Sequence, residues 1–128
     1  MNKEEKIKEK LKEIKIEDYI WLVYVGIIFL SWYSNSLERK MYVETDMVSG
    51  KKYQSIMILI FSVLLIVYSY FFYGSWKDLK DLKPSDSDKD KLLVYLSFIA
   101  STLILISGII FLYVAINNDN NDVELAFN

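Results

Sequence analysis

Apolar residues in this chain gather in three long blocks, and the charged residues fall between or outside the blocks. The blocks cover Tyr19–Leu30, Ile56–Tyr73 and Leu92–Ile116. A helix of about 20 apolar residues crosses the roughly 30 Å hydrocarbon core of a bilayer. A soluble bundle would show a charged face along such helices, and these blocks contain no charged residue. The pattern predicts an all-α integral membrane protein with three transmembrane helices in a small bundle.

The same pattern divides the chain into seven segments, in which charged or polar stretches alternate with the apolar helices. Ser49-Gly50 is the strongest turn signal between the first two helices. The expected segments are a charged cytoplasmic helix (1–17), transmembrane helix 1 (18–33), an outer loop (34–53), transmembrane helix 2 (54–73), a cytoplasmic loop (74–90), transmembrane helix 3 (91–116) and an acidic outer tail (117–128).

The distribution of basic residues predicts the orientation in the membrane. Six lysines lie in Met1–Glu17 and five in Gly74–Lys91, whereas Ser34–Tyr53 holds four basic residues and Asn117–Asn128 holds none. Cytoplasmic loops carry an excess of Lys and Arg. We therefore expect a multi-pass protein of the plasma membrane, with the amino terminus in the cytoplasm and the carboxyl terminus outside.

The first helix is expected to run without a break from near Lys3 into the first apolar block, since no glycine or proline precedes Gly26. Along it, one seam recurs in alternating steps of four and three, as in a heptad pattern. Two interpretations stay open: the cytoplasmic end packs on a partner helix, or it is a solvated arm with three apolar residues on the membrane surface. The seam consists of Ile7, Leu11, Ile14, Asp18, Trp21, Val25, Ile28 and Trp32.

The third block carries small residues that share one face. At about 100° per residue, six of them lie within an arc of about 120°. Small residues let helices approach closely in membranes, and serine hydroxyls hydrogen-bond within or across helices. The face is expected to pack against another helix, with a pore wall or a lipid or small-ligand groove as alternatives. Its members are Ser97, Ala100, Ser101, Ser107, Gly108 and Ala115.

The second block carries a serine stripe of Ser55, Ser62 and Ser69, spaced by seven residues on one helix face. Its simplest partner is the small face of the third block, which would give a bundle held together by small residues. The stripe is therefore a second candidate for helix packing, and it could equally line a pore.

The composition excludes several kinds of chemistry. The chain has no cysteine and no histidine, which removes disulfides, thiol nucleophiles and common zinc sites. Ionisable residues within the membrane are the usual mark of transporters, pumps and intramembrane proteases. The apolar blocks hold no Asp, Glu, Lys, Arg or His. We expect no enzymatic activity, no cofactor and no binding of nucleic acid.

Two polar clusters lie outside the blocks. Asn35, Glu38 and Arg39 follow the first block and form a candidate polar binding cluster, although such clusters are usually solvated helix ends. The oxygen-rich tail lacks the spacing and glycine of an EF-hand loop, so no metal site is expected. The tail's oxygen-bearing residues are Asp119, Asn120, Asp122 and Glu124.

These patterns favour a non-enzymatic role. We expect a membrane-embedded interaction or scaffold subunit that self-associates or assembles with another membrane protein through its small-residue faces. The alternative is a homo-oligomeric channel or pore lined by serine-bearing helix faces. In either case, the lipid bilayer is the surrounding partner.

Overall fold

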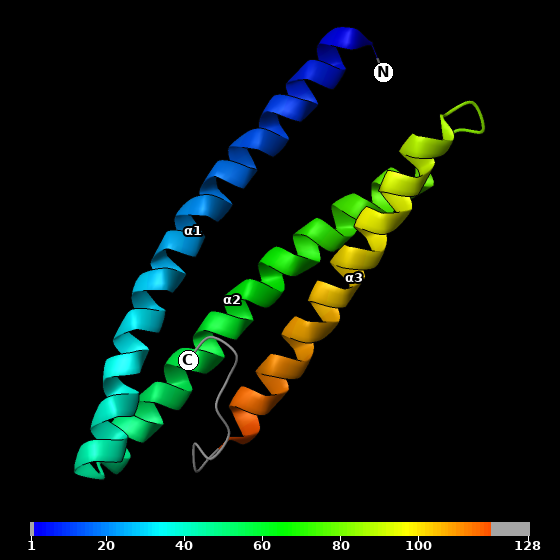
Figure 1. Ribbon diagram of the computed structural model, residues 1–128. Coiled ribbons are helices and arrows are strands. Elements are labelled where there is room, and N and C mark those ends of the chain that lie inside the picture. Colours follow the sequence, from blue (N-terminus) through cyan, green and yellow to red (C-terminus); the bar gives the residue numbers. More distant parts are fainter. Residues whose placement is uncertain (1, 119–128) are drawn as a thin grey trace.

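The computed structural model describes residues 2–118 and folds them into three long α-helices (Figure 1). Helix α1 is Lys3–Glu44, α2 is Met47–Lys80 and α3 is Asp88–Asn117. The predicted all-α fold with three helices is confirmed. The unbroken continuation of the charged amino-terminal segment into the first apolar block is confirmed as well, because both belong to α1.

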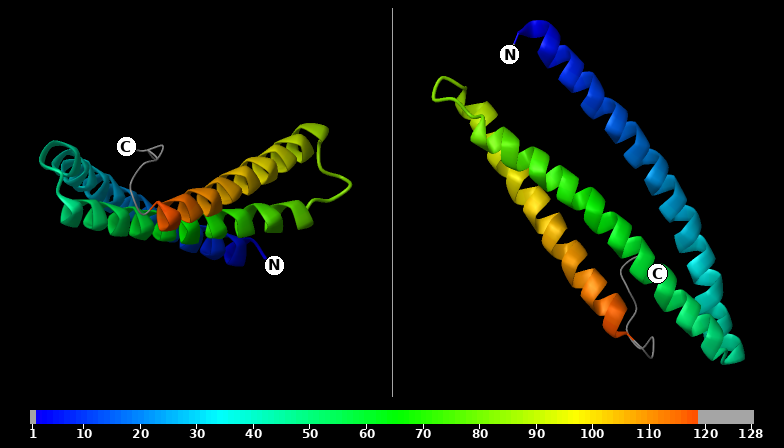
Figure 2. Two further views of the ribbon diagram at one scale, coloured as in Figure 1. Left: turned by 90° about the horizontal axis from the view of Figure 1, so that it is seen from below. Right: turned by 180° about the vertical axis from the view of Figure 1, so that it is seen from behind.

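Helix α2 lies at the centre of the molecule, with α1 on one side and α3 on another (Figure 2). The backbones of α1 and α3 do not approach each other within the described residues. The amino end of α1 and the turn at residues 81–87 lie at one end of the molecule (Figure 1). The turn between α1 and α2 and the last turn of α3 lie at the other end.

The connection between α1 and α2 is two residues long, which corrects the predicted loop over 34–53. Thr45 adopts the left-handed conformation (φ 53°) and ends α1. Asp46 then caps α2 by accepting hydrogen bonds from the backbone N–H groups of Val48 (3.1 Å) and Ser49 (3.4 Å). The predicted turn at Gly50 is also wrong, because Gly50 is buried inside the first turn of α2.

The second connection is closer to the prediction. Helix α2 extends to Lys80, so the expected loop over 74–90 is reduced to residues 81–87. Ser87 caps α3 by accepting a hydrogen bond from the Asp90 N–H at 3.1 Å. Helix α3 ends at Asn117, one residue beyond the expected span, and the oxygen-rich tail lies outside the described residues.

The core lies along α2, towards its amino-terminal half. Met57, Ile60 and Phe61 are each 1% exposed. Leu37 from α1 and Ala115 from α3 complete the buried cluster around them. Truncating a buried side chain of this size typically costs about 2–5 kcal/mol, so these residues hold the three helices together.

Large apolar side chains are exposed along all three helices. In α3 only Gly108 and Ala115 are buried, whereas residues such as Leu103 and Ile110 are more than half exposed. Soluble monomers rarely expose apolar surface on this scale. By length and apolar composition α2 and α3 could each cross a membrane, and α1 is not one of the helices that meet this criterion.

Candidate interaction surfaces

The small face of α3 meets α2 at three residues spaced by seven: Ser101, Gly108 and Ala115. Gly108 and Ala115 are buried, and Ser101 is half-buried. The other three members of the predicted face are exposed. The same spacing of seven residues continues to the half-buried Val94. On a straight α-helix, residues spaced by seven shift by about 20° at each step, so this contact line winds slowly around α3. The exposed members are Ser97, Ala100 and Ser107.

Gly108 is the point of closest approach between the two helices. A Cβ atom at this position would lie 2.9 Å from Cδ2 and 3.3 Å from Cε2 of Tyr68. It would also lie 3.5 Å from Cδ1 of Leu65. Cβ atoms essentially never come within 3.0 Å of a neighbour, so any side chain here would displace the Tyr68 ring. The absence of a side chain at Gly108 therefore makes this packing possible.

Polar side chains join α2 and α3 on both sides of this contact. The hydroxyl groups of Ser75 and Ser101 lie 2.7 Å apart and share a hydrogen bond. Towards the other end, Gln54 Nε2 donates to the carbonyl oxygens of Ala115 and Ile116, both at 3.1 Å. These carbonyls belong to the last turn of α3, where intrahelical donors run out. Gln54 therefore acts as a cap supplied by the neighbouring helix.

Aromatic side chains fill the rest of the same interface. The rings of Phe61 and Phe111 are stacked, with centroids 5.3 Å apart. Phe98 lies between Phe72 (5.5 Å) and Trp76 (5.8 Å). Such pairs typically contribute about 0.5–1.5 kcal/mol beyond the area that they bury. The interface is therefore a mixture of one small-residue contact, stacked rings and terminal hydrogen bonds.

The serine stripe of α2 lies beside this interface and not on its contact line. Ser55 and Ser69 are exposed, and Ser62 is half-buried. Ser62 donates to the carbonyl of Ile58 at 2.7 Å, and Ser69 donates to the carbonyl of Leu65 at 2.8 Å. The nearest contacts to the Cβ position of Gly108 come from Leu65 and Tyr68 and not from the serine stripe.

The heptad seam of α1 lies largely outside the contact with α2, although its members Ile28 and Trp32 line a cavity of about 520 Å³ together with Leu64 and Tyr68 of α2. Its apolar members are exposed by between 43% (Ile14) and 72% (Trp32). Asp18, its one charged member, is exposed as well. The face of α1 that packs on α2 instead buries Ile20, Ser34 and Leu37. The seam is therefore an outward face that continues from the charged arm into the apolar part of the helix.

The polar cluster of Asn35, Glu38 and Arg39 lies near the carboxyl end of α1 and lines, with Tyr42, a shallow hollow of about 280 Å³. Asn35 and Arg39 are exposed, and Glu38 is half-buried. The structure thus brings the three predicted residues together on one side of the helix.

Two ionisable groups outside the apolar segments have shifted pKa values. Hydrogen bonds from the hydroxyl and the backbone N–H of Ser49 lower the pKa of Asp46. At the opposite end, the Glu9 carboxylate lies 3.1 Å from Lys77 Nζ and raises the pKa of that ammonium. This ion pair joins the charged part of α1 to the end of α2.

Sequence reasoning did not single out Gln54 or Ser75, and it did not identify Tyr68 as a contact of Gly108. The antiparallel arrangement of α2 and α3 could have identified these contacts. In such a helical hairpin, residues at about equal distances before and after the connecting turn face each other. Among the described residues, no group of three or more acidic side chains is arranged to hold a metal ion. Comparisons with models of protein families, with curated proteins and with solved structures find no match to this chain.

Proposed function

We propose that this protein is a small three-span membrane protein whose role is assembly. It acts as an interaction or scaffold subunit that binds a second copy or another membrane protein. The observation that carries the proposal is the outward heptad seam of α1, which is apolar except at Asp18 and is covered by no other described helix. A seam of this period is the surface on which another helix packs.

Membrane insertion rests on the dimensions of α2 and α3 and on the packing of α1. Both α2 and α3 are long and apolar enough to cross a bilayer. Helix α1 lies along α2 (Figure 1). Its residues Tyr24, Ile27 and Leu30 pack against the buried cluster of the core. If α2 spans the bilayer, this part of α1 lies at the same depth, so we propose that α1 crosses too.

The orientation follows from the charges at the two ends. The lysine-rich start of α1 and the lysine-bearing turn at 81–87 lie at one end of the molecule. We propose that this end is cytoplasmic and that the turn at Thr45 and Asp46 and the carboxyl terminus are outside. The protein would then be a multi-pass protein of the plasma membrane.

A non-enzymatic role fits the hydrogen bonding of the helices. The hydroxyls of Ser62 and Ser69 donate to carbonyls of their own helix, so neither needs water or an ion as an acceptor. This favours assembly over the alternative of a water-filled pore lined by the serine stripe. Vesicles that contain the purified protein should therefore show background ion flux, and reproducible single-channel steps would contradict the proposal.

The direct test is the mass of the particle extracted from its native membrane into polymer nanodiscs, without detergent. We expect the protein in each particle, without the polymer and the lipid, to have a mass above that of one 15.1 kDa chain. The seam variants Trp21→Ala and Ile28→Ala should lower this mass towards a single chain. Ile110→Ala is the matched control, because Ile110 is similarly exposed (55% against 63% for Ile28) but lies on α3. A single chain in the wild-type particle would refute the proposal.

A further inference from the structure

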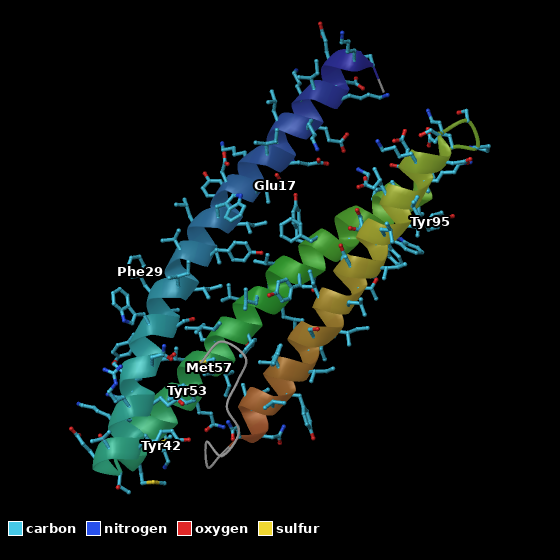
Figure 3. The ribbon with its side chains drawn as sticks, viewed as in Figure 1. Glu17, Phe29, Tyr42, Tyr53, Met57 and Tyr95 are labelled. Carbon is cyan, nitrogen blue, oxygen red and sulfur yellow. The ribbon has the colours of Figure 1, made fainter. Side chains whose placement is uncertain are left out.

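Helices α1 and α2 diverge towards their charged ends (Figure 1). A cavity of about 520 Å³ lies between them in this fork. We call it the fork cavity. The ion pair between Glu9 and Lys77 bridges the two helices across it. Figure 3 labels Glu17 on the edge of α1 that faces α2, and this residue also lines the cavity. The fork cavity therefore has one wall from α1 and one wall from α2, and the ion pair joins the two walls.

The walls of the fork cavity are amphipathic. Ile16 from α1 and the rings of Tyr70 and Phe71 from α2 supply apolar surface. Gly74 leaves the wall of α2 without a side chain, and nothing lies within 4 Å of where its Cβ would be. Charged groups from both helices surround this apolar part. Such a cavity suits a molecule with an apolar portion and a charged head.

The charges in the fork cavity are not balanced, since four carboxylates line it against the three lysines Lys10, Lys12 and Lys77. Glu9, Glu13 and Glu17 follow one another at steps of four, so like charges lie on successive turns of one helix face, which is unfavourable. Lys77 neutralises Glu9 at 3.1 Å, and Lys10 lies 3.8 Å from Glu13. Glu17 is half-buried and forms no ion pair within residues 2–118. A cation with hydrogen-bond donors is what this position lacks.

The depth of the fork cavity rests on the proposed membrane insertion. The apolar block of α2 ends at Tyr73, and about 20 residues of helix span the hydrocarbon core. Lys77 and Asp78, which line the cavity, then lie about 6–8 Å beyond that core, at the level of lipid headgroups. The lipid of the cytoplasmic leaflet is therefore the amphiphile that has direct access.

We propose that the fork cavity binds a phospholipid whose headgroup carries a primary ammonium, as in phosphatidylethanolamine. The ammonium donates hydrogen bonds to the carboxylates of Glu17 and Glu13. A quaternary ammonium has no N–H to donate, and a headgroup with only negative charge adds to the excess of one carboxylate in the lining. The acyl chain runs along Ile16 and Phe71 into the bilayer.

The test measures which lipid stays bound to the full-length chain by native mass spectrometry. Delipidated protein is incubated with phosphatidylethanolamine, phosphatidylcholine or phosphatidylglycerol of the same chain length. We expect phosphatidylethanolamine to be retained about three- to fivefold better than the other two, the size of a partly exposed ion pair. Glu17→Gln should abolish this preference, and Glu17→Lys should shift it towards phosphatidylglycerol.

Asp18→Asn is the matched control, because Asp18 is adjacent to Glu17 but exposed and not part of the cavity wall. It should keep the preference. Equal retention of the three lipids, or an unchanged preference in Glu17→Gln, would overturn the inference. Competition by soluble phosphoethanolamine at the concentration of the lipid would overturn the assignment to a lipid headgroup.

Flotation of the same protein with vesicles separates the two proposals. Protein that floats and resists alkaline extraction, but shows no lipid preference, refutes the fork-cavity inference and leaves the proposed membrane role standing. Protein that fails to float refutes the membrane role, and the fork-cavity inference with it.

Discussion

Substitution of Gly108 tests the packing of α2 on α3 most sharply, because the contact is defined by individual atoms. A Cβ at this position lies 2.9 Å from Cδ2 of Tyr68, whereas nothing lies within 4 Å of a Cβ at Gly26. Gly26 lies in α1 and its position is exposed, so it provides a matched control inside an apolar helix. The two glycines therefore differ in contact and share the same helical backbone preference.

The expected magnitudes follow from two opposing effects. Replacing glycine by alanine in a helix stabilises by up to about 1 kcal/mol, and this is all that Gly26→Ala should show. Overpacking costs about 1–3 kcal/mol, so Gly108→Ala should be less stable than Gly26→Ala by about that amount. Gly108→Leu should cost about 3 kcal/mol or more, because three further carbon atoms must enter the space of the Tyr68 ring.

The assay is reversible unfolding in detergent micelles by titration with a denaturing detergent, followed by circular dichroism. The free energy of unfolding is compared within each pair of variants, which removes the contribution of backbone preference. If Gly108→Leu and Gly26→Leu unfold at the same denaturant fraction, then Gly108 is not a packing contact and the α2–α3 interface is wrong.

Three further predictions concern polar groups that cap or join the helices. The pKa of Asp46 is lowered in the folded chain, so its stabilising effect is full above the ordinary aspartate pKa of about 4 and is lost as the pH falls below it. Asp46→Asn should remove this acid-dependent part of the stability from unfolding curves measured at different pH values. An unchanged pH profile would contradict the capping role. Gln54→Glu should destabilise the protein by about 1–2 kcal/mol at neutral pH, since a carboxylate would face the carbonyls at the end of α3. The loss of stability should shrink at acid pH, where this carboxylate is protonated. Equal stability of the variant at neutral and acid pH would argue against this cap. The double variant Ser75→Cys, Ser101→Cys should form a disulfide on oxidation, because the two hydroxyls are 2.7 Å apart. The double variant Ser69→Cys, Ser101→Cys is the control. Equal yields of the disulfide from both pairs in a gel-shift assay would refute the register of α2 against α3.

The helices themselves could be predicted from the sequence, and their ends only where a local signal was strong. Helix α3 was expected over residues 91–116 and is Asp88–Asn117, because a proline and a serine-rich turn precede its apolar run. The turn between α1 and α2 was missed because Thr45 adopts a left-handed conformation that β-branched residues rarely take. Gly50 was a misleading signal, since it lies in a helix whose first turn is capped by Asp46.

The candidate surfaces could be predicted in part. The small face of α3 was visible from its phase, but only half of it contacts α2, because the contact line follows the drift between a 3.6-residue helix and a heptad. The serine stripe was misleading for a different reason. Serine hydroxyls satisfy themselves on their own helix, so their presence on one face does not identify a partner. Gln54 was missed because its partner is a backbone carbonyl 61 residues away.

The most direct test of the account is the side of the membrane on which each turn lies. The chain has no cysteine, so a single introduced cysteine reports one position without background. Val43→Cys places the label beside the α1–α2 turn, and Ser85→Cys places it in the 81–87 turn; both positions are exposed. The account predicts that a membrane-impermeant maleimide labels Val43→Cys in intact cells and Ser85→Cys only after the membrane is opened. Equal labelling of both positions before lysis would contradict the claim that α2 crosses the bilayer.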